Sequence, residues 1–205
     1  MFLKVCGITR LADGLHAAEH GATALGFVFW PGSPRFIAPE RAAEIIAGLP
    51  ASVITVGLFV NESVEGIRAV VATTGVSTVQ LHGDERPALA DALGQPVIRA
   101  MSVNGGEEAC RAWPADTTFL LDTVDPVLRG GTGVTVDWDR AGTLARGWRV
   151  VLAGGLSPDN VAAAISAVRP FGVDVSSGVE EAPGVKDPDK VARFLANARN
   201  AFETR

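Results

Sequence analysis

The feature that most constrains this 205-residue chain is a repeat of short apolar runs rich in β-branched residues. Most of these runs are followed by an alanine-rich segment with helical spacing, as at residues 38–49 and 157–168. Strands that alternate with helices predict a parallel sheet, because each helix carries the chain back across one face. The runs that we interpret as strands are 2–7, 24–29, 52–60, 77–83, 96–101, 117–122, 148–155 and 172–178.

The number of units selects the architecture. Eight strand-plus-helix units in 205 residues give one unit per ~25 residues, close to the lower size limit of a closed barrel. An open doubly wound sheet usually has about five or six strands and would leave two units over. No Pro/Ser linker or low-complexity segment divides the chain. We therefore predict the α/β class and a single-domain (β/α)8 TIM barrel over residues 1–205, with 104–113 as its weakest helix.

Two helix starts carry clear local signals. Ser157 precedes Pro158, and Asp187 precedes Pro188, so each pair places a capping side chain before a proline in the first turn. We expect a helix to begin at both positions.

Several predicted strands contain polar residues, and side-chain alternation assigns these to a face of the sheet. If Cys6 points into the barrel, Lys4 points there too. The same alternation assigns Gln80, Arg99 and Asp174 to the interior. A buried charge has to be paired, so we expect Lys4 to form an ion pair, with Asp174 as the candidate partner. A Schiff-base lysine is the less favoured interpretation of Lys4.

Composition narrows the classes of partner. The formal net charge is −5 and no basic stripe is present, so neither nucleic acid nor an anionic membrane is an expected partner. The two cysteines, Cys6 and Cys110, and the three histidines lack the spacing of a disulfide framework or a zinc site. No signal-peptide anatomy is present, and no apolar run approaches the ~18 residues that span a bilayer. We expect a cytoplasmic protein that is a monomer, with a homodimer as the alternative.

In a barrel of this kind, the working residues lie at the carboxyl ends of the strands and in the loops that follow. Those positions hold Cys6, Asp122 and His82, side chains that can move a proton. Each also has a structural interpretation, as a buried small hydrophobe, a capping carboxylate and a hydrogen-bonded imidazole. Arg35 follows the second strand in "GSPR"; its guanidinium fork suits a carboxylate, although a loop arginine is usually solvated.

Glycines and serines follow the last two predicted strands, where such barrels often bind phosphate. Gly154 and Gly155 let the backbone approach an anion, and consecutive N–H groups can form a concave nest. Ser176 and Ser177, followed by Gly178, add hydroxyl donors. Tight turns use glycine pairs too, but two such sites on adjacent strands favour phosphate.

A further glycine-rich loop, at 128–138, follows the sixth predicted strand and contains Gly131, Thr132 and Gly133. It is interpreted either as a flexible surface loop or as a mobile lid that closes over the substrate.

Taken together, these motifs resemble one known family, the phosphoribosylanthranilate isomerases of tryptophan biosynthesis. Each fragment alone is weak, but together they cover essentially the whole chain without a departure at a position that carries chemistry. In chain order, the matching stretches are KVCGIT, GFVF, SPR, VGLFVN, VQLHG, LLDT, GGTG with DW behind it, LAGGLSPDNVAAAI and GVDVSSGVEEAPGVKD.

The resemblance implies conversion of N-(5-phosphoribosyl)anthranilate to 1-(2-carboxyphenylamino)-1-deoxyribulose 5-phosphate by an Amadori rearrangement, without cofactor or metal. It implies Cys6 as general base, Asp122 as general acid and Arg35 as ligand of the anthranilate carboxylate. His82 and Asp174 are additional candidates. The groups implied in phosphate binding lie around Gly155, Ser176, Ser177 and Gly178.

Three alternatives stay open at this point. A histidine-pathway aminoaldose isomerase is expected to end its first strand with aspartate, where this chain has Cys6. An indole-glycerol-phosphate synthase would need catalytic lysines and glutamates at strand ends, which the predicted strands lack. A non-catalytic barrel that binds a phosphate ligand would keep the glycine and serine loops without needing both Cys6 and Asp122.

Overall fold

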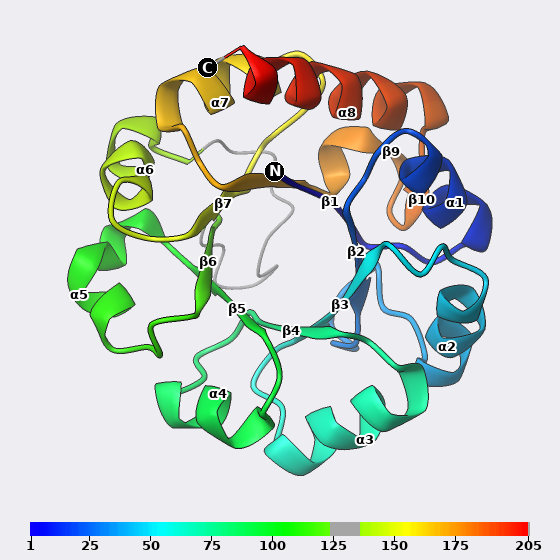
Figure 1. Ribbon diagram of the computed structural model, residues 1–205. Helices are drawn as coiled ribbons and strands as arrows, with labels where there is room; N and C mark the ends of the chain where they lie inside the picture. Colours follow the sequence, from blue (N-terminus) through cyan, green and yellow to red (C-terminus); the bar gives the residue numbers. More distant parts are fainter. Residues whose placement is uncertain (124–135, 205) are drawn as a thin grey trace.

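The computed structural model describes residues 1–123 and 136–204, in which eight parallel strands close into a barrel (Figure 1). Neighbouring strands follow one another in chain order, and β8 pairs with β1 to complete the ring. The (β/α)8 barrel predicted from the repeat is therefore confirmed. The strands are β1 (Phe2–Cys6), β2 (Ala24–Val28), β3 (Ile54–Phe59), β4 (Thr78–Leu81), β5 (Val97–Met101), β6 (Thr118–Leu121), β7 (Val150–Leu152) and β8 (Gly172–Val175).

Helices surround the ring of strands, and α8 packs between α7 and α1 (Figure 1). None of the helices in the described ranges is both long and apolar enough to cross a membrane. The helices are α1 (Leu11–Glu19), α2 (Pro39–Ala47), α3 (Val64–Thr74), α4 (Pro87–Leu93), α5 (Gly106–Arg111), α6 (Trp138–Ala145), α7 (Val161–Val168) and α8 (Pro188–Glu203). Shorter elements are the 3-10 turns η1 (Val103–Gly105) and η2 (Ser177–Val179), and a hairpin of β9 (Glu180–Ala182) and β10 (Val185–Lys186).

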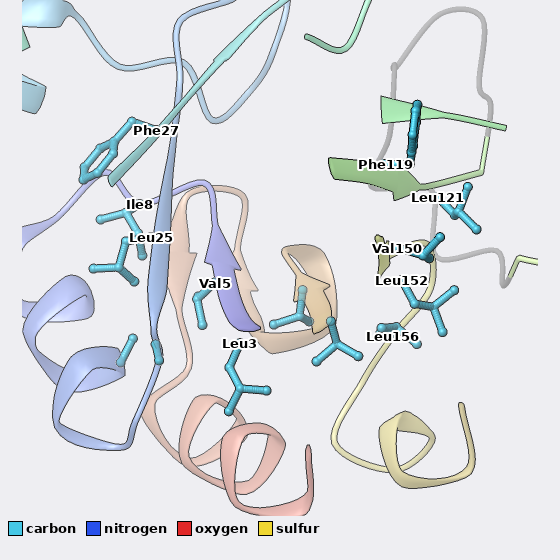
Figure 2. Packing of buried hydrophobic residues seen from close by; sticks show 14 of the residues in the cluster. Leu3, Val5, Ile8, Leu25, Phe27, Phe119, Leu121, Val150, Leu152 and Leu156 are labelled. Atoms are coloured by element: carbon cyan, nitrogen blue, oxygen red, sulfur yellow. The ribbon is translucent and has the colours of Figure 1, made fainter. Parts of the chain in front are cut away.

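The main apolar layer lies between the strands and the helices, as Figure 2 shows. Leu3 and Val5 of β1, Leu25 of β2 and Leu121 of β6 belong to this layer, and each is fully buried. Removing such a side chain from water stabilises the fold by about 1.5–3 kcal/mol. Because successive strand residues point to opposite faces, these outward residues leave the ones between them to line the interior.

The interior of the barrel combines an apolar cluster with a buried ion pair. Lys4 of β1 lies opposite Asp174 of β8 in the register, and Lys4 Nζ is 3.0 Å from Asp174 Oδ1. The ion pair predicted from alternation is therefore confirmed. The apolar cluster consists of Phe2, Ala24, Val56, Ile98, Ala100, Leu120, Val151 and Ala153.

The assignment of Arg99 to the interior is wrong. Its neighbour Ile98 aligns with Gln80 and belongs to the interior cluster, so Arg99 points outward. There its Nη1 donates to Glu85 Oε2 at 2.6 Å, and its guanidinium lies 5.0 Å from the centre of the Trp113 ring. Alternation separates two faces of a strand, but the register with the neighbouring strand decides which face is inside.

One of the two predicted helix starts is correct. The Asp187 side chain accepts a hydrogen bond from the Lys190 N–H at 3.0 Å and caps α8. The prediction at Ser157 is wrong, because α7 begins at Val161. Instead, Asn160 Oδ1 accepts from the Ser157 N–H at 2.8 Å, which closes a turn before the helix. This local bond competes with the helical path of the backbone.

Candidate active site

Cys6 ends β1, and its thiol lies beside β2 at the carboxyl end of the barrel. Gly26 makes room for it, because a Cβ atom at Gly26 would lie 2.6 Å from Cys6 Sγ and 3.1 Å from Lys4 Cε. Burial raises the pKa of the Cys6 thiol, while the positive charges of Lys4 and Lys186 act in the opposite direction. Cys6 is thus a buried thiol next to two cations.

Asp122 directly follows β6. Its Oδ1 accepts a hydrogen bond from the Thr123 N–H at 2.7 Å, and its Oδ2 lies 3.6 Å from His82 Nε2. Burial raises the pKa of Asp122 to about 6, although the Thr123 N–H acts to lower it. A share of the molecules therefore carries a protonated Asp122 carboxyl group near neutral pH.

His82 follows β4 and faces Asp122 from the neighbouring part of the rim. Its Nδ1 lies 3.0 Å from the Nε2 atom of Gln80, whose side chain is buried. With the Gln80 amide as donor, Nδ1 accepts and the ring proton sits on Nε2, the nitrogen that faces Asp122. The structure therefore places His82 beside the candidate acid.

Arg35 lies in the loop after β2, where its Nε and Nη2 donate to the two carboxylate oxygens of Glu180 at 2.8 and 2.7 Å. Its stem covers Gly7, at which a Cβ atom would lie 2.7 Å from Arg35 Cδ. The Arg35 side chain is 13 % exposed, so it is not a solvated loop arginine. Glu180 occupies one edge of the fork, and the Nη1 side is the part that Glu180 does not use.

Glu180 and Lys186, on the β9–β10 hairpin, were missed by the sequence reasoning. Lys186 Nζ lies 2.8 Å from Glu180 Oε1 and 3.3 Å from the Ser176 carbonyl oxygen. The Lys186 side chain is 1 % exposed. A signal was present: opposite charges stand on the two sides of a Pro183–Gly184 turn, which is typical of a hairpin.

The loops after β7 and β8 line one cavity, which also contains Asp122 and Asp174. Gly154 and Gly155 have φ values of 74° and 62°, a left-handed conformation that favours glycine. Next to them, a Cβ atom at Gly178 would clash with the Leu156 carbonyl oxygen.

The hydroxyl-bearing part of this cavity comes from Ser176 and Ser177, which follow β8. The predicted phosphate residues are therefore brought together, next to the candidate acid. Gly131, Thr132 and Gly133 lie outside the described residues.

The comparisons with known proteins agree on one family. Residues 3–197 match the family model described as N-(5'phosphoribosyl)anthranilate (PRA) isomerase. The chain belongs to this family. A PRA isomerase from Trichlorobacter lovleyi is 51% identical over 204 residues, which cover 98% of each chain.

Solved PRA isomerase structures share the fold. The structure from Thermotoga maritima superposes with a TM-score of 0.90 at 43% identity, over 98% of this chain and 99% of that chain. Another PRA isomerase was solved in complex with reduced 1-(o-carboxyphenylamino)-1-deoxyribulose 5-phosphate. It superposes with a TM-score of 0.86 at 41% identity, with 98% and 99% of the two chains covered.

Proposed function

We propose that this chain converts N-(5'-phosphoribosyl)anthranilate to 1-(2-carboxyphenylamino)-1-deoxyribulose 5-phosphate at the rim of its barrel, as a step of tryptophan biosynthesis. Membership of the PRA isomerase family supports this activity. The observation that carries the mechanism is a buried thiol and a carboxyl group of raised pKa at the same end of one barrel. Cys6 and Asp122 supply the base and the acid that an Amadori rearrangement needs.

Asp122 acts first, in its protonated form. It donates its proton to the furanose ring oxygen while the bond from that oxygen to the anomeric carbon breaks. The lone pair of the anthranilate nitrogen then forms a C=N bond, which gives an open-chain iminium. A pKa of about 6 supports this role, because Asp122 holds a proton more readily than an exposed aspartate.

Cys6 acts second, as a thiolate. It removes the proton from the sugar carbon next to the iminium, so that an S–H bond forms and a C–H bond breaks. The electron pair of that C–H bond forms the C=C bond of an enolamine and neutralises the iminium nitrogen. The enolamine tautomerises to the aminoketose, and Cys6 forms no bond to carbon.

The two ends of the substrate are held by different parts of the rim. The loops after β7 and β8, with Gly155, Ser176 and Ser177, bind the phosphate through N–H and hydroxyl groups. Arg35 binds the anthranilate carboxylate on the Nη1 side of its fork. Gly131, Thr132 and Gly133, which lie outside the described residues, are further substrate-binding residues in this proposal.

We also propose that the chain acts in the cytoplasm as a monomeric single-domain barrel. The homodimer is the alternative, and a Thermotoga maritima PRA isomerase is described as dimeric. Sedimentation of the purified chain distinguishes the two states.

The experiment that tests the activity follows the fluorescence of N-(5'-phosphoribosyl)anthranilate after addition of the purified chain. We expect consumption of the substrate and appearance of the aminoketose by chromatography, against a control without protein. Binding of the substrate without consumption would contradict the proposal and support a non-catalytic barrel that binds a phosphate ligand.

A further inference from the structure

We propose that Lys4 and Lys186 are positioning residues that favour the thiolate form of Cys6, and that Asp174 opposes them. This inference rests on the proposed function of Cys6 as the general base. It assigns a role to two buried lysines that take no part in the proposed proton transfers. The chain contains three lysines, and the side chains of these two are 0% and 1% exposed.

Lys4 lies two residues before Cys6 on β1, and its side chain is on the same face of the strand. The point that a Cβ atom of Gly26 would occupy is 2.6 Å from Cys6 Sγ and 3.1 Å from Lys4 Cε. The ammonium and thiol side chains therefore share one small space beside β2. Lys4 Nζ also lies 3.0 Å from Asp174 Oδ1, so the lysine is held between the carboxylate and the thiol.

Lys186 approaches from the β9–β10 hairpin. Its Nζ lies 3.3 Å from the Ser176 carbonyl oxygen at the end of β8 and 2.8 Å from Glu180 Oε1. Its positive charge acts to lower the pKa of Cys6, as does that of Lys4. Lys186 Nζ therefore lies at the end of β8, the strand that pairs with β1, and its charge adds to that of Lys4.

The buried charges around Cys6 balance when the thiol is ionised. The cluster holds three cations, Lys4, Arg35 and Lys186. When Asp122 is protonated, it holds two carboxylates, Asp174 and Glu180. The third negative charge is then the Cys6 thiolate, and the cluster becomes neutral. The charged groups that interact with Cys6 directly are Lys4 on β1, Arg35 after β2, Asp174 on β8 and Lys186 on β10. Glu180 on β9 belongs to the cluster through its ion pairs with Arg35 and Lys186, and Asp122 after β6 through its interactions with Lys4 and Asp174.

Variants of Lys4 and of Asp174 should shift the pKa of Cys6 in opposite directions. Removing the Lys4 ammonium takes away a charge that stabilises the thiolate, so the pKa of Cys6 should rise. Removing the negative charge of Asp174 frees Lys4 to face the thiol, so the pKa of Cys6 should fall. A purely structural role of the pair would move both variants in the same direction.

The experiment measures the pH dependence of Cys6 alkylation by iodoacetamide, in which sulfur displaces iodide and only the thiolate reacts. Cys110 is replaced by alanine throughout, because it is the second free thiol. For Lys4→Met we expect the midpoint to rise by about one pH unit or more, since a nearby opposite charge shifts a pKa by that amount. For Asp174→Asn we expect a lower midpoint, and kcat should follow the thiolate fraction while KM changes little.

Two further variants keep the test decisive. Lys186→Met leaves the Lys4–Asp174 pair intact and should raise the midpoint by a smaller amount than Lys4→Met. Lys190→Met replaces the third lysine, whose side chain is 40% exposed, and should leave the midpoint unchanged. An unchanged midpoint in both Lys4→Met and Lys186→Met overturns the inference. So does a rise in Asp174→Asn.

Failure of the inference and failure of the proposed function can be told apart. Alkylation reports on the ionisation of Cys6 whether or not Cys6 is the base. If Cys6→Ala keeps its activity while the midpoints shift as expected, the assigned base is wrong and the electrostatic effect stands. If Cys6→Ala is inactive while the midpoints do not move, Cys6 is the base and the lysines do not tune it.

Discussion

The surroundings of Cys6, on β1 between β8 and β2, differ from those of Asp122, which follows β6 on another wall of the barrel. The positive charges of Lys4 and Lys186 act on Cys6, whereas Asp122 follows β6, whose Leu120 belongs to the apolar interior cluster. Burial acts to raise the pKa at both places. A raised pKa helps a group that must hold a proton and hinders one that must lose it. The proposed mechanism therefore needs cations beside Cys6, the proposed base, and not beside Asp122, the proposed acid.

The largest effect is expected when either group is removed. Cys6→Ala and Asp122→Asn should each lower kcat by about 10²–10⁴-fold, because each loses one proton-transfer step. Both should keep the thermal unfolding profile of the parent chain, since neither side chain anchors the apolar layer. Near-parental turnover in either purified variant would remove that residue from the mechanism.

Breaking the buried Lys4–Asp174 ion pair should have the largest effect on stability among these variants. Lys4→Met leaves the Asp174 carboxylate buried without its partner, which should lower the free energy of unfolding by about 3–5 kcal/mol. Replacing both members by apolar residues, as in Lys4→Met with Asp174→Leu, should recover much of that loss. Urea denaturation measures both, and equal stability of Lys4→Met and Lys190→Met would contradict the expectation.

A third change tests the rim outside the proton-transfer groups. Arg35→Ala should raise KM by about 10-fold or more, because it removes a charged hydrogen-bond donor from the substrate carboxylate. We expect kcat to change much less. Arg41→Ala, at an exposed arginine on α2, is the matched control. Unchanged affinity for the substrate in titration would mean that the carboxylate binds elsewhere.

The smallest effect concerns pH. Below about 6, Asp122 and Cys6 both carry protons, and the base is missing. As the pH rises through the pKa of Asp122, the pair loses one proton, and the productive form with a thiolate and a protonated Asp122 reaches a constant share. The kcat/KM profile should therefore fall on the acid side with a midpoint of about 6. A midpoint near 4 would indicate an exposed, ordinary carboxylate.

Much of the site could be predicted because strand ends are visible in the sequence. Cys6 and Asp122 each close an apolar run, and parallel strands place such ends at one rim. The pairing of Lys4 with Asp174 also followed, because a buried charge requires a partner of opposite sign. These predictions use local pattern and a general energetic rule, and neither requires knowledge of the register.

Predictions that depended on contacts with other residues were wrong or were not made. Arg99 was assigned to the wrong face, because its outward partners Glu85 and Trp113 come from other segments. The bidentate contact from Arg35 to Glu180 joins residues 145 positions apart, and no local pattern indicates it. Ser157 failed for a smaller reason, because the side chain of Asn160 stabilised a turn instead of a helix start.

The sequence by itself determined the repeating strand–helix unit, the closed barrel and the residue types at its rim, because hydrophobic periodicity and chain length leave few ways to bury the apolar surface. Only the tertiary structure decided which buried charges face which reactive group. That outcome depends on distances of a few ångströms between segments remote in the chain, and such distances set both the pKa values and the edge of Arg35 that Glu180 occupies.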